Sequence, residues 1–544
     1  MPLPKLYELY IRAVGTRGPH GSDGLLLRAA QGREVEAPPG AEDFRDQPGP
    51  QPPAQAPLRP LRASLRSLAP HRRRAPGDRA AFRGFRGRQP ARVRLLPRAH
   101  GRGQGKAATR GARAVGSRLE TAVRDTARAS AGRVRHGRRR RAHGRLHHHS
   151  SADGCGLFGA TIRAMDSLEA RSLIPLTAGY IHMNHAGVSP MSLRVAAAVE
   201  QVVGASVNLP YPGGWAREEA DRVRGLVAHL INVPSDSIAL TRSTAHGISL
   251  LAQGLDWKPG DNVVGAHGEY PANVYPWMAQ AARGVDLRQV HPQEGRISPE
   301  QVFSVVDART RVVALSHVEF WNGFRLDIET IGAECRRRGI LFAVDVMQSA
   351  GALRLDVGRL PIDFCAAGAG KWLMGPPGIG FCFCMPELIE RLQPPIVGVC
   401  SVVGYDRYFE YDLTLSPTAR RFEESVVSLL DTAAFGAALG LLLEVGPDAI
   451  EARVLSLSAR LAEGLDRRGY ELVEPWPRAP AESSGIVSFR KRGARPQEVL
   501  RDLEVAHVVA RIHQDFVRLS PHFYNTEEEI DRVLEVLAPQ SVTT

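Results

Sequence analysis

Cysteine is scarce in this chain of 544 residues. The six cysteines have no paired spacing that would indicate a disulfide framework or a zinc site; they are Cys155, Cys335, Cys365, Cys382, Cys384 and Cys400. No cleavable leader is visible, and no apolar run approaches the roughly 20 residues needed to cross a bilayer. These absences argue against a secreted disulfide scaffold and a transmembrane protein. We expect a soluble cytoplasmic protein with reduced thiols.

Acidic residues are rare in the first third of the chain. The chain has 70 Lys+Arg and 57 Asp+Glu, and residues 1–164 hold 34 of the basic and 11 of the acidic residues. Residues 165–544 therefore hold 70 − 34 = 36 basic and 57 − 11 = 46 acidic residues. The formal net charge of +13 therefore divides into 34 − 11 = +23 and 36 − 46 = −10. Such asymmetry indicates a basic tail attached to a globular body.

Residues 1–164 also lack any hydrophobic period, and they are rich in Arg, Pro, Gly and Ala. Because this composition cannot bury enough apolar surface to offset chain entropy, we predict a disordered basic extension. Its arginines would suit nucleic acid, but aromatic residues are sparse and no recognised nucleic-acid motif is present, which favours a solvated tail. Globular patterning begins directly after Met165, so a mis-assigned translation start is a further alternative.

The rest of the chain is predicted to be α/β. Short apolar runs alternate with helical patterns, which indicates a mostly parallel central sheet covered on both faces. The predicted strands are 237–241, 262–266, 287–290, 311–316, 341–345 and 379–385, with helices near 245–253, 272–283, 299–306 and 327–338. From about Leu429, long helical patterns and a strand at 485–489 indicate a smaller α/β domain. We assign the N-terminal segment and large domain to 165–425 and the small C-terminal domain to 426–544.

One stretch carries a recognisable chemistry. Asp345 ends an apolar run, Gln348 follows three residues later, and Lys371 lies 371 − 345 = 26 positions beyond the acid, before a Gly/Pro-rich turn. A cofactor that acts as an electron sink needs a lysine to hold it as a Schiff base and an acid to keep its ring nitrogen protonated. These residue types fit pyridoxal 5'-phosphate.

Several ordered motifs between residues 180 and 537 resemble the class V aminotransferase family of fold type I pyridoxal-phosphate enzymes. This family includes cysteine desulfurases, selenocysteine lyases and isopenicillin N epimerase-like proteins. The motifs are N-H-A-G at 184–187, T-R-S-T-A-H-G at 241–247, E-Y-P-A-N at 269–273, D-V-M-Q-S-A-G at 345–351, K-W-L-M-G-P-P-G-I-G at 371–380, R-R-F-E at 420–423 and V-R-L-S-P-H-F-Y-N-T-E-E-E-I-D at 517–531.

The resemblance implies that Lys371 binds the cofactor covalently and that Asp345 faces the pyridine nitrogen. A carboxylate at this place favours the protonated ring nitrogen. Gln348 would hydrogen-bond the phenolic oxygen of the cofactor or the lysine. Without the resemblance, an Asp at a strand end is usually a cap, and a Lys near a turn is usually solvated.

Other positions are assigned in the same way. Thr244 and Ala245 would open a helix whose N-terminus binds the cofactor phosphate, although a plain N-cap at Ser243 or Thr244 explains the same pattern. Tyr270 would stack on the pyridine ring, or it is ordinary core. The predicted substrate-binding residues are Asn184, His185, Arg511 and Arg518, with Arg518 as the bidentate clamp of the α-carboxylate.

The chain also departs from the family pattern. Gly368, Ala369 and Gly370 stand where most relatives carry a Ser and a His or Tyr, Phe320 replaces a cofactor-contacting Asn, and Val426 stands in the segment where relatives carry Gly then Thr or Ser. We therefore expect a modest cofactor affinity. No Cys follows Cys400, so the loop that bears the persulfide cysteine of desulfurases has none, and desulfuration through a persulfide is not expected.

The resemblance thus implies a homodimeric enzyme that acts at the Cα of an amino acid, with no metal. Transamination or isopenicillin N epimerase-like epimerisation is our first reading. A selenocysteine- or cysteine-type lyase without the persulfide cysteine is the alternative. From a different class, a catalytically weakened member with a nucleic-acid-binding tail also remains open.

Overall fold

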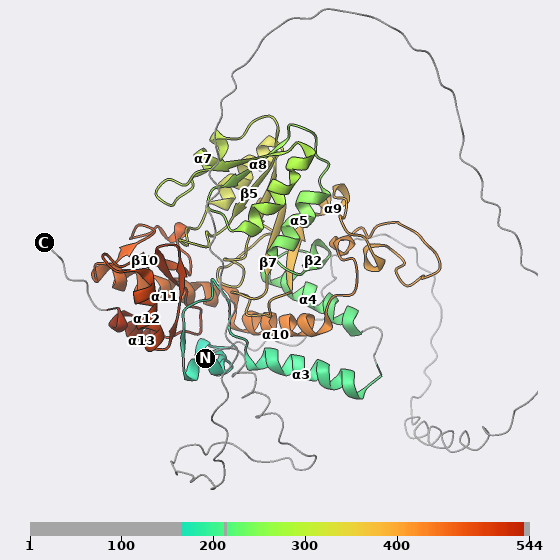
Figure 1. Cartoon of the computed structure of the whole chain (residues 1–544). Helices are drawn as coiled ribbons and strands as arrows, with labels where there is room; N and C mark the ends of the chain where they lie inside the picture. The colour runs from blue at the N-terminus through green and yellow to red at the C-terminus, as the bar shows by residue number, and fades with distance from the viewer. Residues whose placement is uncertain (1–164, 211–214, 538–544) are drawn as a thin grey trace, which may run out of the picture. The chain divides into compact units, whose positions relative to one another are not determined.

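A computed structural model describes residues 165–210 and 215–537 (Figure 1). The predicted disordered extension at 1–164 lies outside these residues. The described part of the chain contains two main sheets, one of seven strands and one of four, together with a two-stranded pair.

The seven-stranded sheet has the order β2-β8-β7-β6-β5-β3-β4. Only β8 runs antiparallel to its neighbours, so the prediction of a mostly parallel central sheet is confirmed. The strands are β2 (Ile238–Thr241), β3 (Asn262–Ala266), β4 (Asp286–Val290), β5 (Thr310–Ser316), β6 (Leu341–Asp345), β7 (Phe364–Gly368) and β8 (Gly380–Cys384).

Both faces of this sheet are buried by helices. In β5, Val313 and Leu315 join one apolar cluster with helices α4, α8 and α10, whereas Val312 and Ala314 join another with α5. The near-continuous apolar sequence of the central strands follows from this burial on two sides. The bounds are α4 (Trp215–Ile231), α5 (Thr244–Gly254), α7 (Pro299–Ser304), α8 (Ile328–Arg338), α9 (Pro386–Arg391) and α10 (Leu429–Val445).

The four-stranded sheet is antiparallel and has the order β12-β13-β10-β9. Helices α11, α12 and α13 pack on it around a separate apolar cluster (Figure 1). The bounds are β9 (Glu471–Leu472), β10 (Val487–Arg490), β12 (Arg511–His513), β13 (Phe516–Leu519), α11 (Pro447–Arg467), α12 (Pro496–Val505) and α13 (Glu527–Val536).

The first described segment links the two sheets. It contains α2 (Ser167–Ser172), β1 (Ile181–His182) and α3 (Leu193–Asn208). Strand β1 pairs in parallel with β11 (Val508–Val509), next to the small sheet, whereas α3 packs against α10 of the large unit. Helix α10 also packs on α4, which covers one face of the large sheet. In space, α10 therefore belongs with the large sheet. The domain boundary between residues 425 and 426 stays a prediction.

Two details differ from the sequence-based prediction. The continuous helix expected near 272–283 is instead a four-residue helix, α6 (Tyr275–Met278), flanked by 3₁₀ turns. Pro271 and Pro276 explain the break, because proline provides no backbone N–H for a continuous helix. Strand β7 was not predicted, since its small residues show no period.

No single helix in the described ranges is long and apolar enough to cross a membrane. The adjoining helices α10 and α11 pass such a test jointly by length and composition, but their axes are bent by 81°.

Candidate active site

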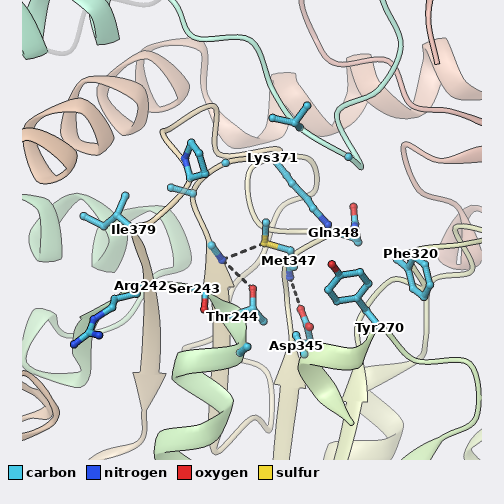
Figure 2. Close-up of a pocket in the computed structure, with 18 of the residues that line it drawn as sticks. Arg242, Ser243, Thr244, Tyr270, Phe320, Asp345, Met347, Gln348, Lys371 and Ile379 are labelled. Carbon is cyan, nitrogen blue, oxygen red and sulfur yellow. Dashed lines mark hydrogen bonds between the residues drawn. The ribbon is translucent and has the colours of Figure 1, made fainter. Parts of the chain in front are cut away.

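A cavity of about 390 Å³ opens at the carboxyl ends of β5 and β6 and beside the first turn of α5. Ligands of α/β sheets bind at such an edge, because loops diverge there and leave a crevice. Six of the predicted site residues line this cavity: Thr244, Ala245, Tyr270, Asp345, Gln348 and Lys371 (Figure 2).

Asp345 enters the cavity from the end of β6, and Lys371 from the loop that follows the neighbouring strand β7. Asp345 ends β6 and is buried, and its Oδ1 accepts a hydrogen bond of 2.8 Å from the Met347 N–H. Burial raises the pKa of Asp345 to about 6, against the lowering effects of this bond and of Lys371. Burial and the charge of Arg518 lower the pKa of Lys371 to about 8, which Asp345 partly opposes. Lys371 therefore has an accessible neutral form, which a nucleophilic amine needs.

Tyr270 faces this lysine across the cavity (Figure 2). The Lys371 Nζ lies 5.3 Å from the centroid of the Tyr270 ring. The same ring contacts Phe320 in a T-shaped arrangement, with the centroids 5.3 Å apart. An aromatic wall thus stands opposite the amine, as a site for a flat heterocycle requires.

The first turn of α5 supplies backbone donors. The Ser243 hydroxyl accepts a hydrogen bond from the His246 N–H at 3.2 Å, so the predicted N-cap is present. The Thr244 hydroxyl accepts from the Gly368 N–H at 3.1 Å, and the Met347 sulfur lies 3.1 Å from that same nitrogen. The thioether thus packs beside Gly368.

Gln348 is held in one orientation by a residue that the sequence did not single out. Its Oε1 accepts a hydrogen bond of 2.8 Å from the Trp372 indole, and its Nε2 donates to the Ala186 carbonyl at 3.2 Å. Since a primary amide has two N–H groups, the second one remains for a ligand in the cavity. Trp372 is fully buried. The position of a tryptophan directly after Lys371 was the sequence signal that could have identified it as a site residue.

The four predicted substrate-binding residues are not part of the cavity wall. His185 is fully buried, with its Nε2 2.9 Å from the Tyr524 hydroxyl and its Nδ1 3.3 Å from the Ser520 carbonyl. Asn184 is also buried, and its Oδ1 has no partner in the described part of the chain. Their predicted contacts with substrate stay predictions.

Arg511 and Arg518 lie opposite each other on β12 and β13. Arg518 is only 2% exposed; its Nη1 donates to the Phe320 carbonyl at 2.5 Å, while its Nε has no partner among the described residues. Because Phe320 lines the cavity, this guanidinium lies directly behind the wall. An orphaned buried donor of this kind suits a carboxylate ligand.

Two further acids lie behind the cavity and were missed in the sequence. Glu269 accepts hydrogen bonds from the Ser316 N–H at 2.6 Å and the Ser316 hydroxyl at 2.5 Å. Burial raises the pKa of Glu269 to about 8, although the bonds from Ser316 oppose the shift. Glu319 has both carboxyl oxygens buried without a partner among the described residues, and burial, Glu269 and Asp345 raise its pKa well above the ordinary value.

The substitution Glu319→Gln is expected to stabilise the protein at alkaline pH. A raised folded-state pKa means that the stability associated with Glu319 is present below the unfolded pKa and is lost as pH rises. Glutamine removes this loss, so the melting temperature at pH 8 should rise by about 2–4 °C, while near the unperturbed glutamate pKa of about 4.3 it should not rise. Thermal unfolding at both pH values measures this, with the exposed Glu200→Gln as control. An equal shift at both pH values would contradict the titration argument.

The residues present fit pyridoxal phosphate. The cavity combines an amine with a lowered pKa, a buried carboxyl at a strand end, a facing aromatic ring and free N–H groups at the first turn of an 11-residue helix. These groups match the aldehyde, the ring nitrogen, the ring face and the phosphate of that cofactor. Among residues 165–210 and 215–537, no group of three His, Cys, Asp or Glu side chains is placed to hold a metal ion.

Comparisons with known proteins agree with this fit. The model of the aminotransferase class-V family matches residues 211–533, more than half of the chain. A probable cysteine desulfurase of Methanothermobacter thermautotrophicus is 28% identical over 69% of this chain and 98% of its own. Isopenicillin N epimerase of Streptomyces clavuligerus is 29% identical over 68% of this chain and 97% of its own. The apo structure of cysteine desulfurase from Thermococcus onnurineus NA1 has a TM-score of 0.62 at 24% identity, and the match covers 68% of this chain and 96% of that one. This likeness confirms the predicted fold type I architecture.

Proposed function

Because the chain belongs to the aminotransferase class-V family and is a pyridoxal-phosphate-dependent enzyme acting on amino acids, we propose that it catalyses transamination or epimerisation at the Cα of its substrate. The observation that carries this proposal is the pair of Asp345 and Lys371 in one cavity at the carboxyl edge of the sheet. Both reactions begin with the removal of the Cα proton, and this pair contains the groups needed for it.

The bound cofactor supplies an electron sink for the charge that is released at Cα. Lys371, with its pKa near 8, takes the proton from Cα and returns it. Asp345 would hold the proton on the ring nitrogen, and its burial would strengthen this interaction because the local dielectric is low. Arg518, directly behind the wall at Phe320, would orient the α-carboxylate with its charge and its unpaired Nε.

Persulfide chemistry on this chain is not part of the proposal. Four of the five described cysteines are buried, and Cys400 lies outside the cavity wall. The turn between β12 and β13 carries Gln514 and Asp515 and no thiol. The alternative of a weakened member is not favoured, because the cavity keeps both Lys371 and Asp345.

A screen of amino acids with the purified chain tests the proposal. The visible absorbance of the bound cofactor should change with a true substrate, and the product should be a keto acid for transamination or the inverted amino acid for epimerisation. Release of a β-substituent instead would point to the lyase reaction. A chain that takes up no cofactor would exclude the proposed function.

We further propose a homodimer in the cytoplasm. Large apolar side chains are strongly exposed on residues 404–414, including Phe409 at 93% and Tyr411 at 96%, and patches of this kind mark interaction surfaces. The free cysteines are compatible with a reducing compartment. Light scattering coupled to gel filtration measures the oligomeric state, and a monomer at micromolar concentration would contradict the dimer.

A further inference from the structure

Arg242 stands between the active-site cavity and a smaller neighbouring one. It lines both the cavity of about 390 Å³ and one of about 290 Å³ that is bordered by residues 423–428. It directly precedes Ser243, the N-cap of α5, and its own N–H is 3.2 Å from the His246 Nδ1. Figure 2 shows Arg242 beside Ser243, with its guanidinium directed away from Lys371. The base of this side chain is therefore fixed at the helix end that offers free N–H groups.

The Arg242 guanidinium is paired with an acid on the protein surface. Its Nη2 donates to the carboxylate of Glu424, and the two side chains are 69% and 28% exposed. An exposed ion pair of this kind contributes a factor of about five or less to an equilibrium. A stronger anion at the first turn of α5 would thus meet little competition from Glu424.

The cavity lacks other charge for a phosphate. Its charged lining residues are Arg242, Asp345 and Lys371, and Lys371 would bind the aldehyde of the cofactor. Ala245 and Gly368 bring no side-chain donor, and the Thr244 hydroxyl, which accepts the Gly368 N–H, carries no charge. A phosphate monoester carries about −1.5 to −2 charges at pH 7. Backbone N–H groups and the dipole of α5 offset only part of this charge.

We propose that Arg242 is the charged ligand of the cofactor phosphate, and that Glu424 competes with the phosphate for its guanidinium. The inference rests on the proposed function. A guanidinium fork suits two phosphate oxygens at once, which a carboxylate partner at the surface also satisfies. Arg242 would thereby replace the Ser hydroxyl and the His or Tyr ring that the family pattern leads us to expect at residues 368–370.

The test compares two ligands that differ only in the phosphate. Apoprotein of the full chain is titrated with pyridoxal phosphate and with pyridoxal, and the absorbance of the bound form gives each Kd. Arg242→Gln should weaken pyridoxal phosphate binding by about 10- to 100-fold, the usual loss for a charged hydrogen-bond pair, and leave pyridoxal within about twofold. Glu424→Gln should strengthen pyridoxal phosphate binding by up to about fivefold and leave pyridoxal unchanged.

Two controls make the result specific. Arg283→Gln removes an exposed guanidinium outside the cavity wall, which among the described residues donates to the Gln253 carbonyl, and should change neither affinity. Arg242→Lys keeps the charge without the fork and should fall between the parent and Arg242→Gln. The inference is overturned if Arg242→Gln binds pyridoxal phosphate as the parent does, or if it loses pyridoxal affinity by the same factor. A parent chain that binds no pyridoxal phosphate overturns the proposed function itself.

Discussion

Replacing Lys371 with alanine is expected to abolish covalent attachment of the cofactor and to lower kcat by about 10²- to 10⁴-fold, the contribution of a positioned acid–base group. Lys371 has no ion-pair partner among the described residues and lies in a partly buried position with a lowered pKa. Alanine therefore removes a desolvated amine without leaving an acid newly unpaired at hydrogen-bond distance. The folded structure should persist.

Borohydride reduction followed by peptide mass spectrometry measures the attachment. In the parent the cofactor should be found on the peptide containing Lys371, and in Lys371→Ala on none. Lys258→Ala is the matched control, because Lys258 lies outside the cavity wall and its substitution should leave attachment and turnover unchanged. Cofactor trapped on another lysine, or normal turnover by Lys371→Ala, would show that the assignment is wrong.

The second large effect is expected at Asp345. Asp345→Asn should keep the cofactor attached but lower kcat by about 10²- to 10³-fold, the typical loss when one preorganised electrostatic group is removed. Asparagine keeps the size and the oxygen that accepts the Met347 N–H, so only the charge is lost. The ring nitrogen then loses the anion that stabilises its proton.

Stability separates this effect from a structural one. Because burial raises the pKa of Asp345 to about 6, the parent apoprotein loses stability as pH rises from the unfolded value of about 3.9 through 6. Asp345→Asn lacks this loss, so its apoprotein should be at least as stable as the parent at pH 7. Asp363→Asn makes the same chemical change just before β7, where the carboxylate accepts the Phe342 N–H, and should leave kcat near the parental value. A lower melting temperature for Asp345→Asn at pH 7 would indicate a structural role instead.

The large sheet was predictable because its signal is local. Apolar runs such as 311–316 and 341–345 are bounded by turn residues, and each became a strand. Strand β7 consists of Phe-Cys-Ala-Ala-Gly, whose small residues are apolar without being typical of strands. Strands β11, β12 and β13 span only two to four residues each, so their existence depends on partners far along the chain.

The candidate site divides in the same way. Asp345 ends a strand of the large sheet, and Gln348, Thr244 and Lys371 each follow one. The common edge brings them together. Glu319 and Trp372 matter through burial and through partners on other elements, which a motif does not reveal. The position of Arg518 behind Phe320 depends on a contact across 198 residues of sequence.

The segment that links the two sheets has a mechanical consequence. Ile181 accompanies β11, the Ser520 N–H donates to the Met183 carbonyl at 2.7 Å, and the Ser189 N–H donates to the Gly370 carbonyl at 3.0 Å, one residue before Lys371. Main-chain hydrogen bonds thus connect this segment to the small sheet at one end and to the loop before Lys371 at the other. A displacement of the small sheet would therefore pull on the loop that carries Lys371. Because the linkage uses backbone atoms, substitution of side chains in the segment would leave these hydrogen bonds in place.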